Sequence, residues 1–253
     1  MFGVFRRWRR RRTLRREFPG AWTEILRANV PLYSRLPEPQ KSKVRQHVQV
    51  LLAEKRFEGC GGLEITDEIR VTIAGHAALL LLGRAEDYFP RLGSILVYPS
   101  AYKGRVEHHV GPGIVEEGSQ GRLGESWTDG SVVLAWDAAL HGATVLGDGQ
   151  NVVLHEFAHQ LDQEDRSADG TPYLGGRGRY VAWARVLGAD FEQLREGRPG
   201  VLDSYGATNP AEFFAVATET FFEKPRQLKA RNPELYEQLR EYYGLDLAAD
   251  APP

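Results

Sequence analysis

The sequence predicts an α+β fold, with a predominantly helical first part, then a small mixed sheet and further helices. In the first part, apolar residues recur at spacings of three and four, as they do along one face of a helix. These spacings predict helices near residues 21–30, 40–57 and 66–83. Short apolar runs between Gly, Pro and Asp-Gly turns predict strands at Ser94–Tyr98, near residues 113–117 and at Ser131–Trp136. Helices, strands and helices in separate blocks along the chain indicate an α+β architecture.

Length and composition are those of an ordinary globular protein. The 253 residues are 42% hydrophobic and 26% charged, which suffices for a sizeable core. A single cysteine, Cys60, excludes an internal disulfide and a thiolate metal cluster. No secretory leader or membrane-spanning apolar stretch is evident, so a cytoplasmic location is expected. The predicted organisation is a basic, disordered tail at residues 1–18, one domain at residues 19–245 that is helical to about residue 90, and a flexible C-terminus at residues 246–253.

Charge is distributed unevenly along the chain. Residues 1–16 contain eight Arg and no acidic residue, so the formal net charge of −2 becomes −10 for the remainder. Phe2, Val4, Phe5 and Trp8 give this basic segment an apolar component. Such a segment is typical of a weak contact with an anionic membrane surface or nucleic acid, and equally of a solvated tail that binds nothing. Direct DNA binding by the rest of the protein is not expected, because an acidic surface repels phosphates.

A motif of the form H-E-x-x-H, from His155 to His159, lies in an apolar run that begins after Asn151. Asn151 is a suitable helix cap, and residues four apart on a helix share one face, so the two His can bind one metal ion. Glu156 follows the first His directly, where its carboxylate can reach a water on that ion. This arrangement is typical of zinc peptidases. The alternative, a half-exposed helix whose His face solvent, is disfavoured by the apolar surroundings.

A tetrahedral zinc site that keeps one position for water needs a third protein ligand. No His follows at the short spacing of some zinc peptidases. A second apolar helix is predicted after Asn209, with Pro210 at its first position. Glu212 in that helix is a candidate ligand, although a Glu three residues after a cap also fits a capping box. Glu219, two turns later on the same face, is the rival ligand, and spacing alone does not separate the two.

Further side chains are candidates for supporting the metal ligands. Asp162 shares the face of the two His and can accept the second N–H of a ligand imidazole, unless it is a surface residue near the helix end. With Glu212 as the ligand, Glu219 joins Asp162 in this supporting role.

The remaining helices are predicted near residues 178–195 and 233–243.

Two blocks of sequence carry a family resemblance. HEFAHQLD at residues 155–162 and SYGATNPAEFFAVATETFF at residues 204–222 resemble the Mlc titration factor A family of bacterial zinc peptidases, and are also similar to the catalytic domain of anthrax lethal factor. The resemblance covers most of residues 20–243. It implies a zincin-like peptidase domain with one Zn²⁺ per chain, in which Glu212 is the third ligand beside His155 and His159. It also implies that Tyr205 assists catalysis.

The strand at Ser131–Trp136 has a further predicted role. Zinc peptidases commonly place an edge strand above the metal helix, where an extended substrate adds as another strand. By resemblance, Val133, Leu134 and Ala135 are the candidates for this strand. The same apolar run also fits a strand buried in the core.

The resemblance implies aminopeptidase activity on a peptide or protein substrate, with Glu156 as general base. In some members it also implies binding to a Mlc-like transcriptional repressor. Endopeptidase action is the alternative within the same class, because no local motif provides an acidic anchor for a free amino terminus. A repressor-titrating module with weak or latent peptidase activity is the alternative from another class.

Overall fold

The computed structural model describes residues 2–84, 87–100 and 130–250, together with the backbone of five short strands between residues 102 and 127. The chain begins with α1 (Phe2–Leu14), α2 (Gly20–Asn29), α3 (Pro31–Arg35), α4 (Glu38–Glu54), β1 (Arg56–Gly59) and α5 (Asp67–Leu79). The strands that follow are β2 (Ser94–Tyr98), β3 (Tyr102–Lys103), β4 (Val106–His109), β5 (Val115–Gly118), β6 (Gly121–Arg122), β7 (Gly124–Trp127) and β8 (Ser131–Ala135). The last part contains α6 (Trp136–Thr144), α7 (Val152–Asp162), the 3-10 turn η1 (Gln163–Asp165), α8 (Arg177–Arg195), the 3-10 turn η2 (Ser204–Ala207), α9 (Pro210–Glu223), α10 (Pro225–Arg231), α11 (Pro233–Tyr243) and α12 (Leu247–Asp250). Within the described ranges, no helix is both long and apolar enough to cross a membrane.

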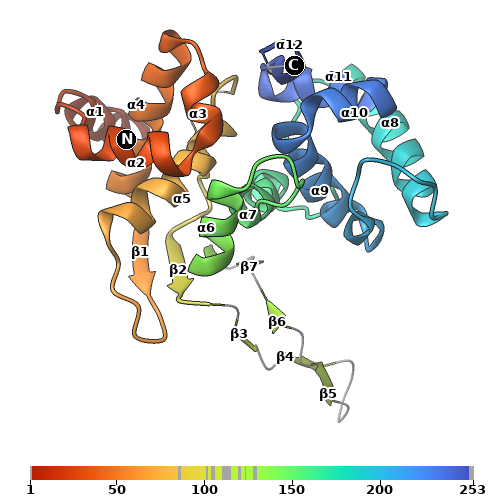
Figure 1. The fold of residues 1–253 in the computed structure, drawn as a ribbon, viewed down its shortest axis with the longest axis horizontal. Coiled ribbons are helices and arrows are strands. Elements are labelled where there is room, and N and C mark those ends of the chain that lie inside the picture. Colours follow the sequence, from red (N-terminus) through yellow and green to blue (C-terminus); the bar gives the residue numbers. More distant parts are fainter. Residues whose placement is uncertain are drawn as a thin grey trace.

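The main sheet has four strands in the order β1-β2-β8-β7, and helices precede and follow it along the chain (Figure 1). Strands β1, β2 and β8 run parallel, and β7 is antiparallel to β8, so the sheet is mixed. Ile95 pairs with Val132 and Val97 with Leu134, and all four side chains are buried. Helix α7 packs against β7 and β8. The predicted α+β class is therefore confirmed.

The prediction that the strand at Ser131–Trp136 lies at an edge of the sheet is wrong. Strand β8 pairs with β2 on one side and with β7 on the other. Val133, Leu134 and Ala135 are at most 2% exposed. The apolar run reflects a strand that is covered on both faces, which is the alternative that the sequence left open. The sheet edge beside α7 is formed instead by β7.

The two chain ends contain helices where the sequence predicts disorder. In α1, the guanidinium of Arg10 donates two hydrogen bonds to the Glu54 carboxylate, at 2.7 and 2.9 Å, and lies 4.3 Å from the centre of the Tyr88 ring. A paired, charge-assisted contact of this kind holds a helix in place. Its partner is 44 residues away, in α4, so local composition could not reveal it. At the other end, Leu247 of α12 is buried in the core.

One apolar core joins the helices before and after the sheet, and α7 lies between α5 and α9 (Figure 1). After α5 the backbone of the chain passes very close to the end of α11. A Cβ atom on Gly83 would lie 2.0 Å from the carbonyl oxygen of Tyr243, so only glycine fits there. Nearby, Arg84 forms an ion pair of 2.9 Å with Glu164, just beyond α7. Helix α7 is thus held between two packed groups of helices.

Candidate metal centre

Helix α7 carries both His of the H-E-x-x-H motif. It begins after Asn151, whose side-chain oxygen accepts the Leu154 N–H at 3.1 Å and caps the helix, as the sequence predicts. Most apolar side chains of α7 are buried in the core, namely Val153, Leu154, Phe157, Ala158 and Leu161. His155 and His159, one turn apart, both lie against α9, with ring centroids separated by 4.9 Å.

Helix α9 supplies carboxylates to these imidazoles. Asn209 caps the helix by accepting the Glu212 N–H at 3.0 Å, and Pro210 occupies the first position, as predicted. The Glu212 carboxylate extends to the two rings, where Oε2 lies 3.0 Å from His155 Nε2 and 3.5 Å from His159 Nε2. The capping-box alternative therefore does not describe the Glu212 side chain.

These three side chains are arranged as the ligands of one tetrahedral ion would be. The Nε2 atoms of His155 and His159 are 3.3 Å apart, and Glu212 Oε2 completes a triangle with sides of 3.0 and 3.5 Å. Ligand atoms that sit 2.0–2.1 Å from zinc at tetrahedral angles are separated by about 3.3–3.4 Å. Among the described residues, His155, His159 and Glu212 are the group with atoms close enough to share an ion. Two imidazoles and a carboxylate are also a donor set that zinc prefers.

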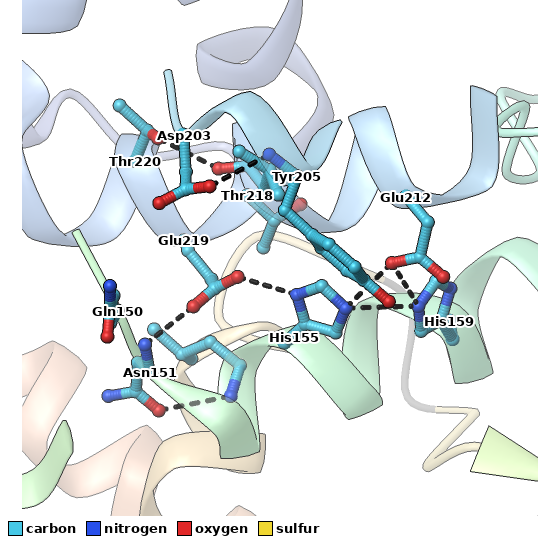
Figure 2. A network of polar contacts seen from close by, with 12 residues as sticks. Gln150, Asn151, His155, His159, Asp203, Tyr205, Glu212, Thr218, Glu219 and Thr220 are labelled. Atoms are coloured by element: carbon cyan, nitrogen blue, oxygen red, sulfur yellow. Dashed lines mark hydrogen bonds and ion pairs between the residues drawn. The ribbon is translucent and has the colours of Figure 1, made fainter. Parts of the chain in front are cut away.

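Glu219 lies on the other side of the His155 ring. Its Oε1 is 2.6 Å from Nδ1, and its Oε2 accepts the backbone N–H of Asn151 at 2.6 Å. Figure 2 shows Glu219 and Glu212 reaching the two nitrogens of His155 from opposite sides. A carboxylate on Nδ1 fixes the tautomer whose Nε2 lone pair is available to a metal. Both acidic residues therefore contact His155, Glu219 at Nδ1 and Glu212 at Nε2.

Two carboxylates contact the imidazole rings. Burial lowers the pKa of His155, but hydrogen bonds with Glu212 and Glu219 outweigh it and raise that pKa to about 10. Burial raises the pKa of Glu212, yet its bonds to the two His bring it down to about 2. The site thus favours a positive charge at its centre, carried either by a proton on His155 or by a metal ion in its place.

Glu156 and Tyr205 border the same cluster. Glu156 is 5% exposed, and burial raises its pKa to about 7, the range in which a carboxylate can both take and return a proton. Tyr205 is on η2, where its backbone N–H donates to Asp203 at 2.8 Å. Its ring centroid lies 6.0 Å from that of His155, and its hydroxyl end points toward the cluster (Figure 2). The Tyr205 side chain is 55% exposed, so a molecule that enters from solvent can reach it.

Asp162 is fully buried, and its carboxylate accepts a hydrogen bond from a loop rather than from an imidazole. Its Oδ2 accepts the N–H of Gly170 at 3.0 Å. Gly170 has a φ of +77°, and a Cβ there would lie 2.3 Å from the carbonyl oxygen of Pro210, at the start of α9. Asp162 therefore positions the loop against the helix that carries Glu212. The predicted contact with a ligand imidazole is made by Glu219 instead, because Glu219 faces His155 directly across the helix interface.

Glu223 is a half-buried carboxylate that the sequence pattern did not single out. Its Oε2 accepts the Gly147 N–H at 2.9 Å, and its Oε1 lies 3.4 Å from Nδ2 of Asn151. Burial raises the pKa of Glu223 to about 7. Its spacing in the sequence is the signal that could have identified it, because Glu223 follows Glu219 by one helical turn and so shares its face. Glu219 and Glu223 together hold the start of α7 against α9.

A helix with an H-E-x-x-H motif, joined by a carboxylate from a second helix, is the arrangement of a metallopeptidase-like centre. The chain belongs to the glucose-regulated metallo-peptidase M90 family, whose family model matches residues 5–244. It is 41% identical over 244 residues to an uncharacterized protein of Synechocystis, covering 94% of this chain and 89% of the relative. It is 30% identical over 237 residues to Mlc titration factor A of Yersinia pestis and of Yersinia pseudotuberculosis, covering 91% of this chain and 86% of each relative. The family resemblance seen in the sequence is therefore confirmed.

Proposed function

We propose that the protein is a zinc-dependent peptidase that acts as an aminopeptidase. The observation that carries the proposal is the triangle of ligand atoms formed by His155, His159 and Glu212, with sides of 3.0–3.5 Å. Membership of a metallo-peptidase family supports the reaction class. Zn²⁺ held by these three side chains would supply a Lewis acid and lower the pKa of water toward neutrality.

The other residues of the site have separate tasks in this proposal. Glu219 accepts a hydrogen bond from Nδ1–H of His155 and so leaves the Nε2 lone pair free to bind a metal ion. Glu156 accepts the proton of the attacking water and delivers it to the leaving amine, a task suited to its pKa of about 7. The hydroxyl of Tyr205 donates a hydrogen bond to the oxyanion that forms from the scissile carbonyl.

The substrate backbone aligns with strand β7 in this proposal. In the described sheet, β7 pairs on one side only, with β8, and it packs beside α7. An extended peptide can hydrogen-bond to such an edge as an additional strand. Strand β8 then pairs with the side of β7 that is turned away from the substrate, so Val133, Leu134 and Ala135 do not contact the substrate.

Peptides with free and with acetylated amino termini test the activity and its exo specificity. We expect zinc-loaded wild-type protein to shorten free peptides from the amino end and to leave acetylated ones intact. Glu156→Gln should retain bound zinc, measured by elemental analysis, and lose turnover. Cleavage of acetylated peptides would make the protein an endopeptidase. Cleavage by Glu156→Gln at the wild-type rate would remove Glu156 as the base.

A second function is favoured by the relatives that carry the name Mlc titration factor A. We propose that the chain also binds a Mlc-like transcriptional repressor in the cytoplasm, and that this binding does not need turnover. The Glu156→Gln variant separates the two functions, because its fold and metal ligands are unchanged. Repressor binding by this variant, measured by calorimetry, would support a titrating role. Absence of binding by wild-type protein would refute it.

A further inference from the structure

Helix α1 is attached to the protein through one of its faces. Arg10 pairs with Glu54, and Arg6 donates to the backbone oxygen of Asp87 at 3.0 Å. Both Arg side chains point toward α4 and the segment before β2, and Thr13 follows on the same side of the helix. The helix is therefore fixed in orientation, and its opposite face is directed at solvent.

That opposite face carries aromatic side chains beside charged ones. Phe5 and Trp8 are 63% and 55% exposed, and their rings stack with centroids 6.1 Å apart. Arg9 and Arg12 are exposed beside them, and the Arg12 guanidinium lies 5.9 Å from the centre of the Trp8 ring. At 100° per residue these four positions lie on one side of the helix, and their mean direction is about 130° around the helix from that of Arg6 and Arg10. We call Phe5, Trp8, Arg9 and Arg12 the outer face of α1; the side chains of Phe2 and Val4 are outside the described residues.

The charge around the outer face has one sign. Six Arg side chains of this segment are exposed, and among the described residues the ion pairs of the segment involve only Arg6 and Arg10. The exposed ones are Arg7, Arg9, Arg11, Arg12, Arg15 and Arg16. The remainder of the chain carries a formal charge of −10, so this positive charge is local. Its natural complement is a surface with a high density of negative charge.

We infer that the outer face of α1 binds the surface of an anionic phospholipid membrane. Arg side chains contact lipid phosphates, and the rings of Phe5 and Trp8 enter the boundary between headgroups and acyl chains. The two exposed rings on this face favour a membrane over nucleic acid, because duplex DNA offers a polar, charged surface to such a helix. The interaction keeps the metal centre accessible, since α1 packs on α4, whereas the metal centre is formed by α7 and α9.

Sedimentation of the full-length protein with phosphatidylcholine vesicles, with and without phosphatidylglycerol, tests this inference. We expect binding only to the anionic vesicles, and weaker binding as salt is raised. Phe5→Ser combined with Trp8→Ser should reduce the binding constant at least about tenfold, whereas Trp8→Phe should largely retain it. Arg9→Gln combined with Arg12→Gln should also weaken binding. Arg185→Gln combined with Arg198→Gln has the same change in charge on another surface and serves as the control.

The inference fails if wild-type protein does not bind anionic vesicles, or if the double aromatic variant binds them as wild-type protein does. Binding to duplex DNA in a parallel titration, without binding to vesicles, would also overturn it. All the substituted side chains point into solvent, and circular dichroism will show whether the variants remain folded. Peptidase turnover of the aromatic variant should match that of wild-type protein.

Discussion

Glu219 Oε1 lies 2.6 Å from His155 Nδ1, while the other oxygen of the same carboxylate accepts the backbone N–H of Asn151. One side chain therefore orients a candidate metal ligand and also holds the first turn of the helix that carries it. Because the contact is on Nδ1, it leaves Nε2 for the ion. Glu212 approaches that second nitrogen at 3.0 Å.

Glu219→Ala should weaken zinc binding about 10–100-fold, because the His155 ring loses the group that fixes its tautomer. Glu212→Ala removes a ligand and should weaken it more. Competition with a chromophoric chelator measures both affinities, and Glu234→Ala, at an exposed position, is the control. Our assignment is wrong if the Glu219 variant loses zinc and the Glu212 variant keeps it.

Tyr205→Phe should lower kcat by about tenfold to a thousandfold with little change in KM, because its proposed hydrogen bond is made only to the oxyanion. Zinc content should be unchanged, since the Tyr205 ring lies beside His155 and outside the triangle of ligand atoms. Steady-state kinetics on one peptide provide both constants. A rise in KM with unchanged kcat would mean that Tyr205 binds the substrate in its ground state.

Gly170→Ala should destabilise the fold by at least about 2 kcal/mol, since the new methyl group would collide with the Pro210 backbone in a left-handed conformation. In this variant the loop would displace the start of α9, which carries Glu212, so zinc binding should also weaken. Gly175→Ala is a matched control: its φ is +78°, and nothing lies within 4 Å of its Cβ. Only the backbone cost of about 1 kcal/mol is expected there. Equal losses in denaturant unfolding would contradict the proposed contact.

Acid should destabilise the protein through two buried imidazoles. Burial lowers the pKa of His47 and of His76 from 6.5 to about 4. At these two His, the unfolded chain therefore binds protons below pH 6.5, whereas the folded protein binds them only below about pH 4. Stability that is present above pH 6.5 is lost as the pH falls toward 4, by about 3 kcal/mol for each His.

Urea unfolding at a series of pH values measures this loss. In His47→Gln the free energy of unfolding should depend less steeply on pH between 4 and 6.5 than in wild-type protein. His141→Gln, at an exposed position, is the control. An unchanged slope in the His47 variant would show that its imidazole is not held neutral by the fold.

Much of the candidate site could be predicted because its signals are local. The caps Asn151 and Asn209 and the spacing of His155 and His159 each depend on a few neighbouring residues. The choice between Glu212 and Glu219 could not be made in this way. Both lie on one face of α9, and the packing of α9 across α7 decides which nitrogen each one meets.

The order of strands in the sheet and the docking of α1 were also beyond local signals. Strand β8 is internal because β7, from the preceding segment, pairs along its second side. An apolar strand has the same sequence pattern whether or not that partner exists. Helix α1 is held in place by the pairing of Arg10 with the Glu54 carboxylate, and a run of Arg residues does not indicate that distant partner.

The two carboxylates that meet His155 are seven residues apart on a continuous helix, which gives the centre a strict requirement for helical phase. Substitutions between Glu212 and Glu219 leave both side chains pointing at the ring. One inserted residue turns one of them by about 100°, away from it. A relative that retains both acids and both His, but with the two acids eight residues apart, should therefore bind zinc more weakly at this position, although every expected residue is present in its sequence.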